Sequence, residues 1–494
     1  MKTLSKNILR IVGVGFLCLH IFAGGVNISH AAAPTGSEKT IPAEEKRTTE
    51  KNQTALNLTL EEAIRMAFEN NSLLRIERMN PEIQQTYENQ EHALFDPVLK
   101  LEGDYSREKS QAGATTTTGP SSSGTRVEPP DLIMEGTDVQ LQLTKPFSTG
   151  TEISAGVSTN RAWTNKPTKR YKTRIGLRVT QALLRNAGRD VNLAGLRQAE
   201  LKTRMTFYEL RGYSETLLAE MEAAYWNYAL SLHQVKIVAE SLSLAKQQQL
   251  ETEEMITVGI LAETEIVASQ AEIALRRQYL IDIQSKSAVS RLRLLQLLNP
   301  KSLKSLKHDI ILLSEPAIPE IKPGDVEAYV STALRMRPDL NQARLDLERN
   351  MLEIIKTRNG LLPQMDLFIS LGKTGYADSF RNSVDDIDGR RYDVTAGIDF
   401  EFPVRNRVAA ARHQRARLSQ TQAKEAINNL SRIVELDVRS AHIAIKRTEQ
   451  QLSASKSTRM LQKEKLRIET EKFRVGRSTN FLVAQAQRDF MLSL

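Results

Sequence analysis

The chain has 494 residues, a single cysteine and a formal net charge of +9, from 68 lysines and arginines against 59 aspartates and glutamates. One cysteine excludes an intrachain disulfide framework. The basic and acidic residues alternate rather than cluster, which favours solvated helix faces and excludes a nucleic-acid-binding surface built on a basic block.

The segment 1–33 has the pattern of a secretory signal. A basic start without acidic residues is followed by an apolar run at 11–26 and by alanines at 31–33. This order is typical of a segment that is cleaved during secretion. A transmembrane anchor is the alternative, but glycines and His20 interrupt a run that is already shorter than the roughly 20 residues of a spanning helix. We therefore expect 1–33 to be a signal peptide.

The single cysteine, Cys18, lies inside this signal. A lipoprotein would carry its lipid on such a cysteine, but Leu17 precedes it where a small residue is expected. We expect a mature chain without a thiol, which suits an oxidising compartment. The next segment, 34–57, is rich in Glu, Lys and Thr and predicts a disordered N-terminal tail.

From position 58 onward the chain reads as two copies of one unit, at 58–298 and 325–494. Each copy predicts a helix, strands, a very long helix, a break and another long helix. The copies are related by a constant offset in the numbering, shown by the pairs Ala67 and Ala333, Leu74 and Leu340, and Pro97 and Pro363. Such self-similarity marks a duplicated structural unit.

Strands are predicted at 95–181 in the first copy and at 364–402 in the second. In Tyr392–Phe402 apolar residues alternate with polar residues or glycine, and 171–181 has the same period of two. Segments of about ten residues with one apolar and one charged face suit a barrel wall between lipid and water. A sheet half-buried on a soluble core would show the same alternation. The polar stretches at 106–136 and 373–391 favour the barrel, because they read as long loops at one end of the strands.

The helical prediction is strongest at 213–258, which contains neither glycine nor proline. Forty-six helical residues span roughly 70 Å, too long for an ordinary globular core. Side-by-side packing in a coiled-coil-like wall is expected instead. The predicted heptad seam comprises Leu218, Met221, Tyr225, Tyr228, Leu232, Val235, Ala239 and Leu242.

The two copies are joined by a connector at 299–324, where four prolines prevent a continuous helix. No stretch after the signal is long and apolar enough for a transmembrane helix, so a membrane role would have to use strands.

Motifs of catalysis are missing from the sequence. It contains no glycine-rich phosphate loop, no zinc-protease or Cys-x-x-Cys motif and no nucleophile elbow. The histidines outside the signal have no His or Cys at ligand spacing: His92, His233, His308, His413 and His442. We expect neither an enzyme nor a bound cofactor or metal.

The duplicated motifs resemble the TolC outer-membrane efflux family from about Leu58 to Leu494. The resemblance rests on their order: Leu-Thr-Leu-Glu-Glu-Ala-Ile at 58–64, its counterpart at 326–334, strand-ending elements at Gln181 and Phe402, and two Val-Gly motifs followed by helices. It implies a homotrimer whose subunits each give four strands to a shared outer-membrane β-barrel and long antiparallel coiled-coil helices to a periplasmic α-barrel, an α+β membrane protein.

The resemblance also implies a site at the tunnel tip, where a periplasmic adaptor docks and couples the channel to an inner-membrane pump. Glycine in each Val-Gly motif breaks the helix, and Thr264 or 478–480 would cap the next one. A plain helical-hairpin turn is the alternative. The expected tip residues are Val258, Gly259, Ile260, Val475, Gly476 and Arg477.

Three departures from the family pattern stand out. Family members often place acids after the second Val-Gly motif, whereas this chain has Leu482 and Gln485; Glu263 and Glu265 after the first motif would have to supply an acidic constriction. The last helix looks short, because the sequence stops at Leu494, soon after the second motif. The turn at 147–151 divides the first copy into up to four strands where the family uses two; the extra hairpin could extend the barrel outside the membrane.

The leading hypothesis is an outer-membrane channel subunit of a tripartite efflux or type I secretion system, a passive conduit with a periplasmic tunnel in a Gram-negative envelope. Its expected partners are two further copies, the adaptor, the pump and outer-membrane lipid, with no nucleic acid. The alternative is a secreted periplasmic coiled-coil structural or adaptor protein without a pore.

Overall fold

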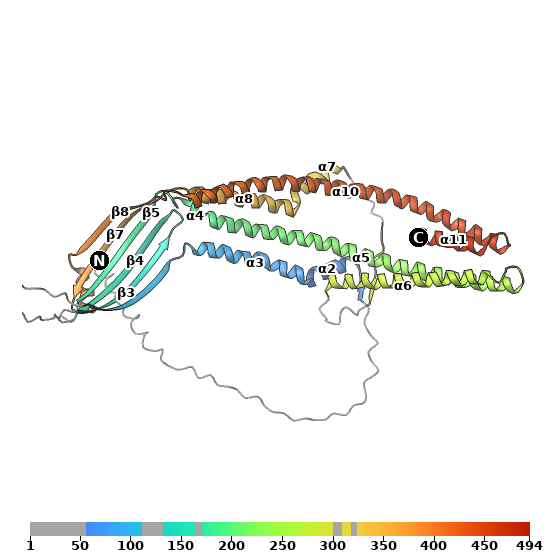
Figure 1. Cartoon of the computed structure of the whole chain (residues 1–494), viewed down its shortest axis with the longest axis horizontal. Helices are drawn as coiled ribbons and strands as arrows, with labels where there is room; N and C mark the ends of the chain where they lie inside the picture. Colours follow the sequence, from blue (N-terminus) through green and yellow to red (C-terminus); the bar gives the residue numbers. More distant parts are fainter. Residues whose placement is uncertain (1–55, 111–131, 165–169, 300–308, 318–323) are drawn as a thin grey trace, which may run out of the picture. The chain divides into compact units, whose positions relative to one another are not determined.

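The computed structural model describes residues 56–110, 132–164, 170–299, 309–317 and 324–494. Their elements form one antiparallel sheet and a set of long helices that continue from its strands (Figure 1). The predicted signal 1–33 lies outside the described residues, as does all but the last two residues of the predicted tail.

The helices that open the two copies have matching bounds. They are α2 (Leu60–Asn70) and α3 (Ser72–Ala93) in the first copy and α7 (Val326–Met336) and α8 (Pro338–Asn359) in the second. Both pairs keep the constant offset found in the sequence. Leu74 and Leu340, which this offset equates, are fully buried. A capping box between Thr59 and Glu62 satisfies the first amides of α2.

A single six-stranded sheet contains strands of both copies, in the order β2-β3-β4-β5-β7-β8 with every pair antiparallel. The strands are β2 (Val98–Ser110), β3 (Leu132–Pro146), β4 (Thr151–Thr164), β5 (Arg170–Ala182), β7 (Gln364–Ala377) and β8 (Tyr392–Glu401). The sheet therefore has two strands more than the four per subunit that the family resemblance implied for the barrel. The hairpin β3–β4 accounts for the difference.

The two faces of the sheet differ in polarity, as the alternation predicted. Cross-strand pairing places apolar side chains on one face in continuous rows, such as Leu101, Leu141, Val157 and Ile175. Among the described residues, no helix covers this face along β8, where Tyr392 is 75% exposed and Phe400 63% exposed. The alternative of a sheet half-buried on a soluble core is therefore wrong for β8.

The opposite face carries the polar side chains. There the Arg174 guanidinium of β5 crosses the intervening strand β7 to reach the Asp393 carboxylate of β8. It passes over Gly372, where a Cβ would lie 2.6 Å from the guanidinium. Glycine at this position thus allows an ion pair between two strands that are not neighbours.

Part of the loop predicted at 373–391 is structured. Strand β7 continues to Ala377, and α9 (Phe380–Asp385) and the short helix η3 (Asp386–Asp388) fold against β5 and β7. Thr173 and Ser383 share a buried hydrogen bond of 2.7 Å. A Cβ on Gly375 would lie 2.0 Å from the Ser383 carbonyl, so glycine lets α9 approach the sheet closely.

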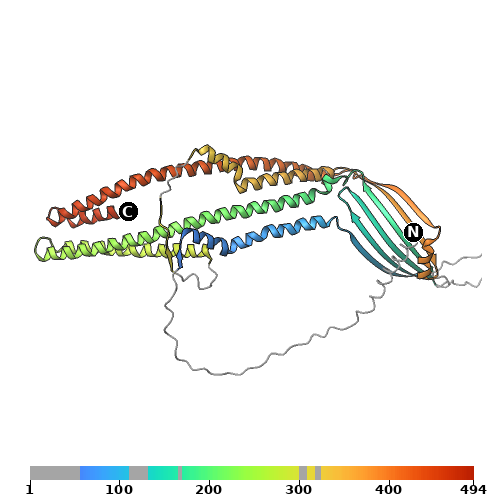
Figure 2. The ribbon, with the colours of Figure 1, turned by 180° about the vertical axis from the view of Figure 1, so that it is seen from behind.

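Four helices lie side by side in the order α3-α5-α8-α10, and each continues from a strand of the sheet (Figures 1 and 2). After the short helix α4 (Arg189–Asn192) come α5 (Ala194–Thr257) and α6 (Glu265–Leu298) in the first copy, and α10 (Arg407–Arg474) and α11 (Asn480–Ser493) in the second. At 1.5 Å per residue, α5 and α10 are each about 100 Å long. Within the described part of the chain, no helix combines the length and the apolar character of a membrane span.

The predicted seam of α5 is right only at Met221, Tyr225 and Tyr228, which are buried. Its first residue, Leu218, is 36% exposed, and Leu232 is 38% exposed. Beyond Tyr228 the buried positions of α5 carry mainly small or polar side chains: Ala229, Ser231, Val238, Ser241, Ala245, Gln248 and Thr252. They face α6 through contacts such as the 3.1 Å hydrogen bond between Ser231 and Ser287. The larger apolar side chains of this stretch are therefore left on the outside of the helix pair.

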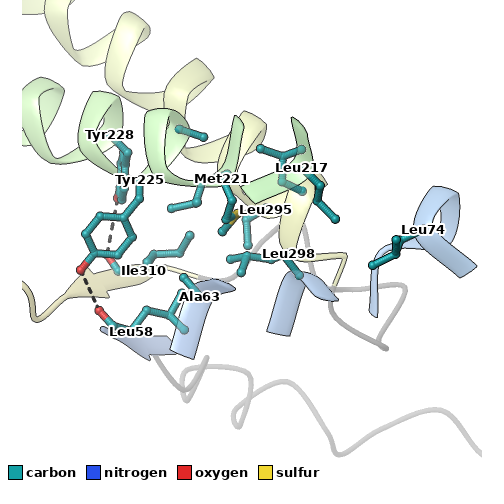
Figure 3. Packing of buried hydrophobic residues seen from close by; sticks show 14 residues of the cluster. Leu58, Ala63, Leu74, Leu217, Met221, Tyr225, Tyr228, Leu295, Leu298 and Ile310 are labelled. Carbon is teal, nitrogen blue, oxygen red and sulfur yellow. Dashed lines mark hydrogen bonds between the residues drawn. The ribbon is translucent and has the colours of Figure 1, made fainter. Parts of the chain in front are cut away.

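The main apolar core lies where α2, α5 and α6 meet two short strands, β1 (Leu56–Leu58) and β6 (Ile310–Leu312) (Figure 3). These strands pair in parallel and join the start of the first copy to the connector. The Tyr225 hydroxyl donates to the Leu58 carbonyl at 3.1 Å and accepts from the Ser314 amide at 3.1 Å. Two residues before the predicted boundary at 58 are thus part of a strand, and the Pro-rich connector contains a strand, because both segments find partners in this core.

Candidate functional site

Both Val-Gly motifs form the same helix-ending turn. In the first, the Gly259 amide donates to the Ile256 carbonyl at 3.0 Å and the Ile260 amide to the Met255 carbonyl at 2.9 Å. In the second, Gly476 and Arg477 repeat this pattern at 2.9 and 2.8 Å. This is the Schellman arrangement, which requires a left-handed residue after the helix. The φ angles of Gly259 and Gly476, 78° and 69°, meet that requirement.

The turns lie at the helix ends away from the sheet (Figure 1). The three apolar side chains at the turns are strongly exposed: Val258 at 69%, Ile260 at 61% and Val475 at 68%. Arg477 is exposed as well. Each turn therefore presents an apolar tip with no cover from the rest of the described chain, and only the second adds a cation.

The helices that follow the turns begin differently. Thr479 caps α11 by accepting a hydrogen bond from the Leu482 amide at 3.4 Å, as the sequence predicted. The predicted cap at Thr264 is wrong, because Thr264 has helical backbone angles and its side chain makes no cap hydrogen bond. The start of α6 is held by backbone hydrogen bonds instead, among them Glu265 to Ala262 at 3.1 Å.

The four candidate constriction residues stay apart in the single chain. Glu263 is exposed between the first turn and α6, and Glu265 is half-buried in the first turn of α6. Leu482 and Gln485 are both exposed on α11. Within the described residues, no hydrogen bond joins any two of these four side chains. An acidic constriction would thus require the same residues from further copies.

Behind the turns, a buried polar network joins the two copies. The side chain of Arg276 on α6 is 4% exposed. It donates to the Ser241 carbonyl of α5 at 2.9 Å and to the Gln487 amide oxygen of α11 at 3.0 Å, and it pairs with Glu272 of its own helix at 2.9 Å. The same Glu272 carboxylate also pairs with Arg488 of α11.

A second polar contact fixes the start of α11. The Asn480 amide nitrogen donates to the Ser269 hydroxyl of α6 at 2.6 Å, and Asn480 is buried. Val483 and Ala486 of the same helix are buried as well. The position of α11 on the first hairpin therefore depends on hydrogen bonds to buried charged and amide groups, which are costly to leave unpaired.

Sequence reasoning missed this network. Glu272 and Arg276 are four residues apart on a helix, a spacing that usually marks an exposed pair. The only signal that set them apart was the small side chains of the buried residues Ser241 and Ala245 on α5, the helix that packs against α6.

Charged side chains surround the second turn. The Glu469 carboxylate accepts hydrogen bonds from the Lys472 ammonium at 2.7 Å and from the Ser478 hydroxyl at 2.9 Å. These contacts lower the pKa of Glu469 below its ordinary value of 4.5. No group of three or more potential metal ligands is assembled in the described ranges.

With this geometry, comparison with known proteins becomes informative. The family model described as outer membrane efflux protein matches residues 329–493. The chain is also similar to the solved outer-membrane channel OprN, with 15% identity, a TM-score of 0.63 and coverage of 94% of this chain and 93% of that one. The fold of this chain is that of TolC-like outer-membrane channels, and the sequence of its second copy matches the outer membrane efflux protein family.

Two further structures share the TolC-like fold. One is the CmeC outer membrane channel of Campylobacter jejuni, with 15% identity, a TM-score of 0.63 and coverage of 95% of this chain and 89% of that one. The other is the outer membrane protein VceC of Vibrio cholerae, with 14% identity, a TM-score of 0.63 and coverage of 88% and 90%. Among curated protein sequences, none matches this chain significantly. The likeness to these channels is therefore one of fold over most of the chain, and one of sequence over its second copy.

Proposed function

We propose that this protein is the outer-membrane channel subunit of a tripartite efflux or type I secretion system, in which three copies form a passive conduit through the outer membrane and the periplasm. The observation that carries the proposal is the apolar face of the six-stranded sheet, whose large apolar side chains are strongly exposed on the edge strands β2 and β8. In water, a face of this size would drive aggregation, whereas against acyl chains it is stable.

Aromatic side chains at both ends of the apolar face support its place in a membrane. Tyr105 and Tyr171 lie in one cross-strand row near the loop end of the sheet. Phe400 lies on the same face near the helix end. Transmembrane barrels carry such aromatic girdles at the two lipid–water interfaces.

Exposed apolar side chains on the helices support association of several copies. On α10, Leu436, Ile443 and Met460 are 64–66% exposed. Leu230 and Leu250 of α5 are exposed as well. Rows of this kind on long helices are expected to be buried by neighbouring copies in a helical wall.

The two turns are the proposed docking points for a periplasmic adaptor, which would couple the channel to an inner-membrane pump. They combine exposed Val258, Ile260 and Val475 with a rigid glycine turn, so that an apolar tip is presented in one fixed backbone geometry. An adaptor contact would bury these side chains. The cargo would then be chosen largely by the pump.

The channel is tested by purifying the full chain from membranes and reconstituting it. We expect fractionation with the outer membrane, a heat-sensitive trimer on gels and ion conductance in planar bilayers. A soluble monomer without conductance would contradict the proposal and favour a secreted coiled-coil protein. Docking is tested by co-purification of an adaptor, which substitution of Val258 and Val475 by aspartate should reduce without affecting trimer formation.

A further inference from the structure

The hairpin β3–β4 is a full part of the sheet. It lies between β2 and β5 and pairs with both over nearly their whole length. The turn between its strands is tight: the Phe147 amide donates to the Thr151 carbonyl at 2.8 Å, and the Gly150 amide to the Phe147 carbonyl at 3.0 Å. With 15 and 14 residues, β3 and β4 would each rise about 35 Å along a barrel axis at a tilt of about 40°, more than the apolar band of about 25 Å requires.

The hairpin also continues both faces of the sheet. On the apolar face Leu141 of β3 is 38% exposed, close to the 45% of Leu371 on β7. Val157 of β4 extends the same row. Gln140 and Ser158, which pair with each other, continue the polar face. A hairpin that left the membrane would have no reason to keep an uncovered apolar face.

The widths of the helical and strand layers give an independent argument. Four helices per subunit continue from the sheet, which at interaxial distances of 8–10 Å occupy an arc of about 32–40 Å. Six strands spaced 4.8 Å apart and tilted by about 40° occupy an arc of about 38 Å, whereas four occupy about 25 Å. With six strands, the sheet matches the perimeter of the helices that continue from it.

The edge strands indicate where the next copy pairs. Leu99 and Leu101 of β2 are 65% and 68% exposed, and Val394 and Ile398 of β8 are 60% and 57% exposed. Apolar side chains on the inner strands, each flanked on two sides, are only about 40% exposed. Strands β2 and β8 run in opposite directions, so β8 of one copy can pair with β2 of another in an antiparallel ladder. Such pairing satisfies edge amides that have no partner in lipid.

We infer that β3 and β4 cross the membrane within the barrel wall, so that three copies close a barrel of eighteen strands. The inference rests on the proposed trimeric channel. A wall of eighteen strands encloses a wide aqueous lumen, comparable to those of the large porins. In this chain the outer-membrane section is therefore as wide as the helical tunnel that continues from it.

The inference is tested with single nitroxide labels in the full-length trimer reconstituted into phosphatidylcholine vesicles. Labels replace Leu141 and Val157 on the apolar face of the hairpin, with Gln140 and Ser158 as matched controls on its polar face. Leu371 and Ser370 of β7 serve as the reference pair. Cys18 is the only native cysteine and lies in the predicted signal, so each label has one site.

Frequent collisions of the nitroxide with oxygen indicate that the label lies in lipid. Frequent collisions with a water-soluble nickel chelate indicate that it lies in water. We expect the oxygen-to-nickel ratio at Leu141 and Val157 to equal that at Leu371 and to exceed that at Gln140 and Ser158 severalfold. Nickel access at Leu141 and Val157 with a lipid signal at Leu371 would overturn the eighteen-stranded wall but leave the channel intact. Nickel access at Leu371 as well would contradict the channel itself. Electron cryo-microscopy of the trimer in nanodiscs counts the strands of the barrel independently. A barrel of twelve strands would overturn the inference.

Discussion

The two helical hairpins of the chain end in the same turn but are held together by different forces. In the first, α6 packs against α5 along its whole length and reaches the apolar core, where Leu294, Leu295 and Leu298 are buried. In the second, α11 contacts the first hairpin through the polar side chains of Arg276 and Asn480, and Val483 and Ala486 of α11 are buried. Hydrophobic burial along its length fixes α6, whereas the attachment of α11 to the first hairpin includes a buried polar network.

This difference identifies the part of the helical end that is easiest to move. Apolar packing along a long helix is spread over many residues, so that no single change releases it. A network centred on one guanidinium can be broken at one point, and its buried partners then lose their hydrogen bonds together. We therefore expect the α10–α11 hairpin to separate from the first hairpin before α5 and α6 separate from each other.

Replacement of Arg276 by alanine should have the largest effect. Removing one member of a buried ion pair costs about 3 kcal/mol, which corresponds to roughly 100-fold faster local opening. Amide hydrogen exchange should accelerate by that factor in α11 and change little in α6 near Leu294. Arg277→Ala, at the exposed neighbouring position, is the control. Unchanged exchange in α11 would show that the network does not hold this helix.

Alanine at the turn glycines should produce a smaller, equal effect at both hairpins. A Cβ on Gly259 or Gly476 would meet nothing within 4 Å, so the cost arises only from the left-handed backbone, about 1–2 kcal/mol. Denaturant unfolding should show the same loss for both variants. Gly212→Ala within α5 should stabilise instead, because helical alanine is preferred and its Cβ would make an ordinary 3.5 Å contact. Unequal losses at the two turns would contradict their equivalence.

Lowering the pH should increase the mobility of the second turn only. Its effect should be smaller than those of the Arg276 and glycine substitutions. Glu469 is lowered in pKa by its contacts to Lys472 and Ser478, so its contribution is complete above 4.5 and is lost as the pH falls through the lower folded value. The equivalent position before the first turn is Thr252, which does not ionise in this range. A nitroxide at Val475 should gain mobility below pH 4.5, whereas one at Val258 should not. Glu469→Gln should abolish this pH dependence.

Much of the sheet could be predicted from the sequence, because alternation of apolar and polar residues shows directly on which face of the sheet each side chain lies. The alternation of Tyr392–Phe402 gave both the strand and its apolar face. The two glycine turns were predictable for a similar reason, since a single residue type satisfies the left-handed backbone. These signals are local, and each is complete within a short stretch of chain.

The features that escaped prediction depend on distant partners. Helix α9 packs on the sheet because Gly375 and Thr173 leave room for it, and neither residue signals this locally. The network of Arg276 joins residues 211 positions apart. On α5, the prediction placed the larger apolar residues beyond Tyr228 in the buried seam. The close approach of α6 instead requires small side chains at the buried positions. Pairwise packing of this kind has no periodic signature in one sequence.

The turn at Phe147–Gly150 bears on the engineering of protein pores. This turn returns the chain directly to the sheet without continuing into a helix. The hairpin β3–β4 is therefore a separable unit that begins and ends on the loop side of the sheet. Removing or adding one such unit per subunit would change the aperture of the ring in discrete steps of six strands, while the coupling surfaces at the far end keep their spacing. A series of protein nanopores with different diameters is thus expected from one helical scaffold.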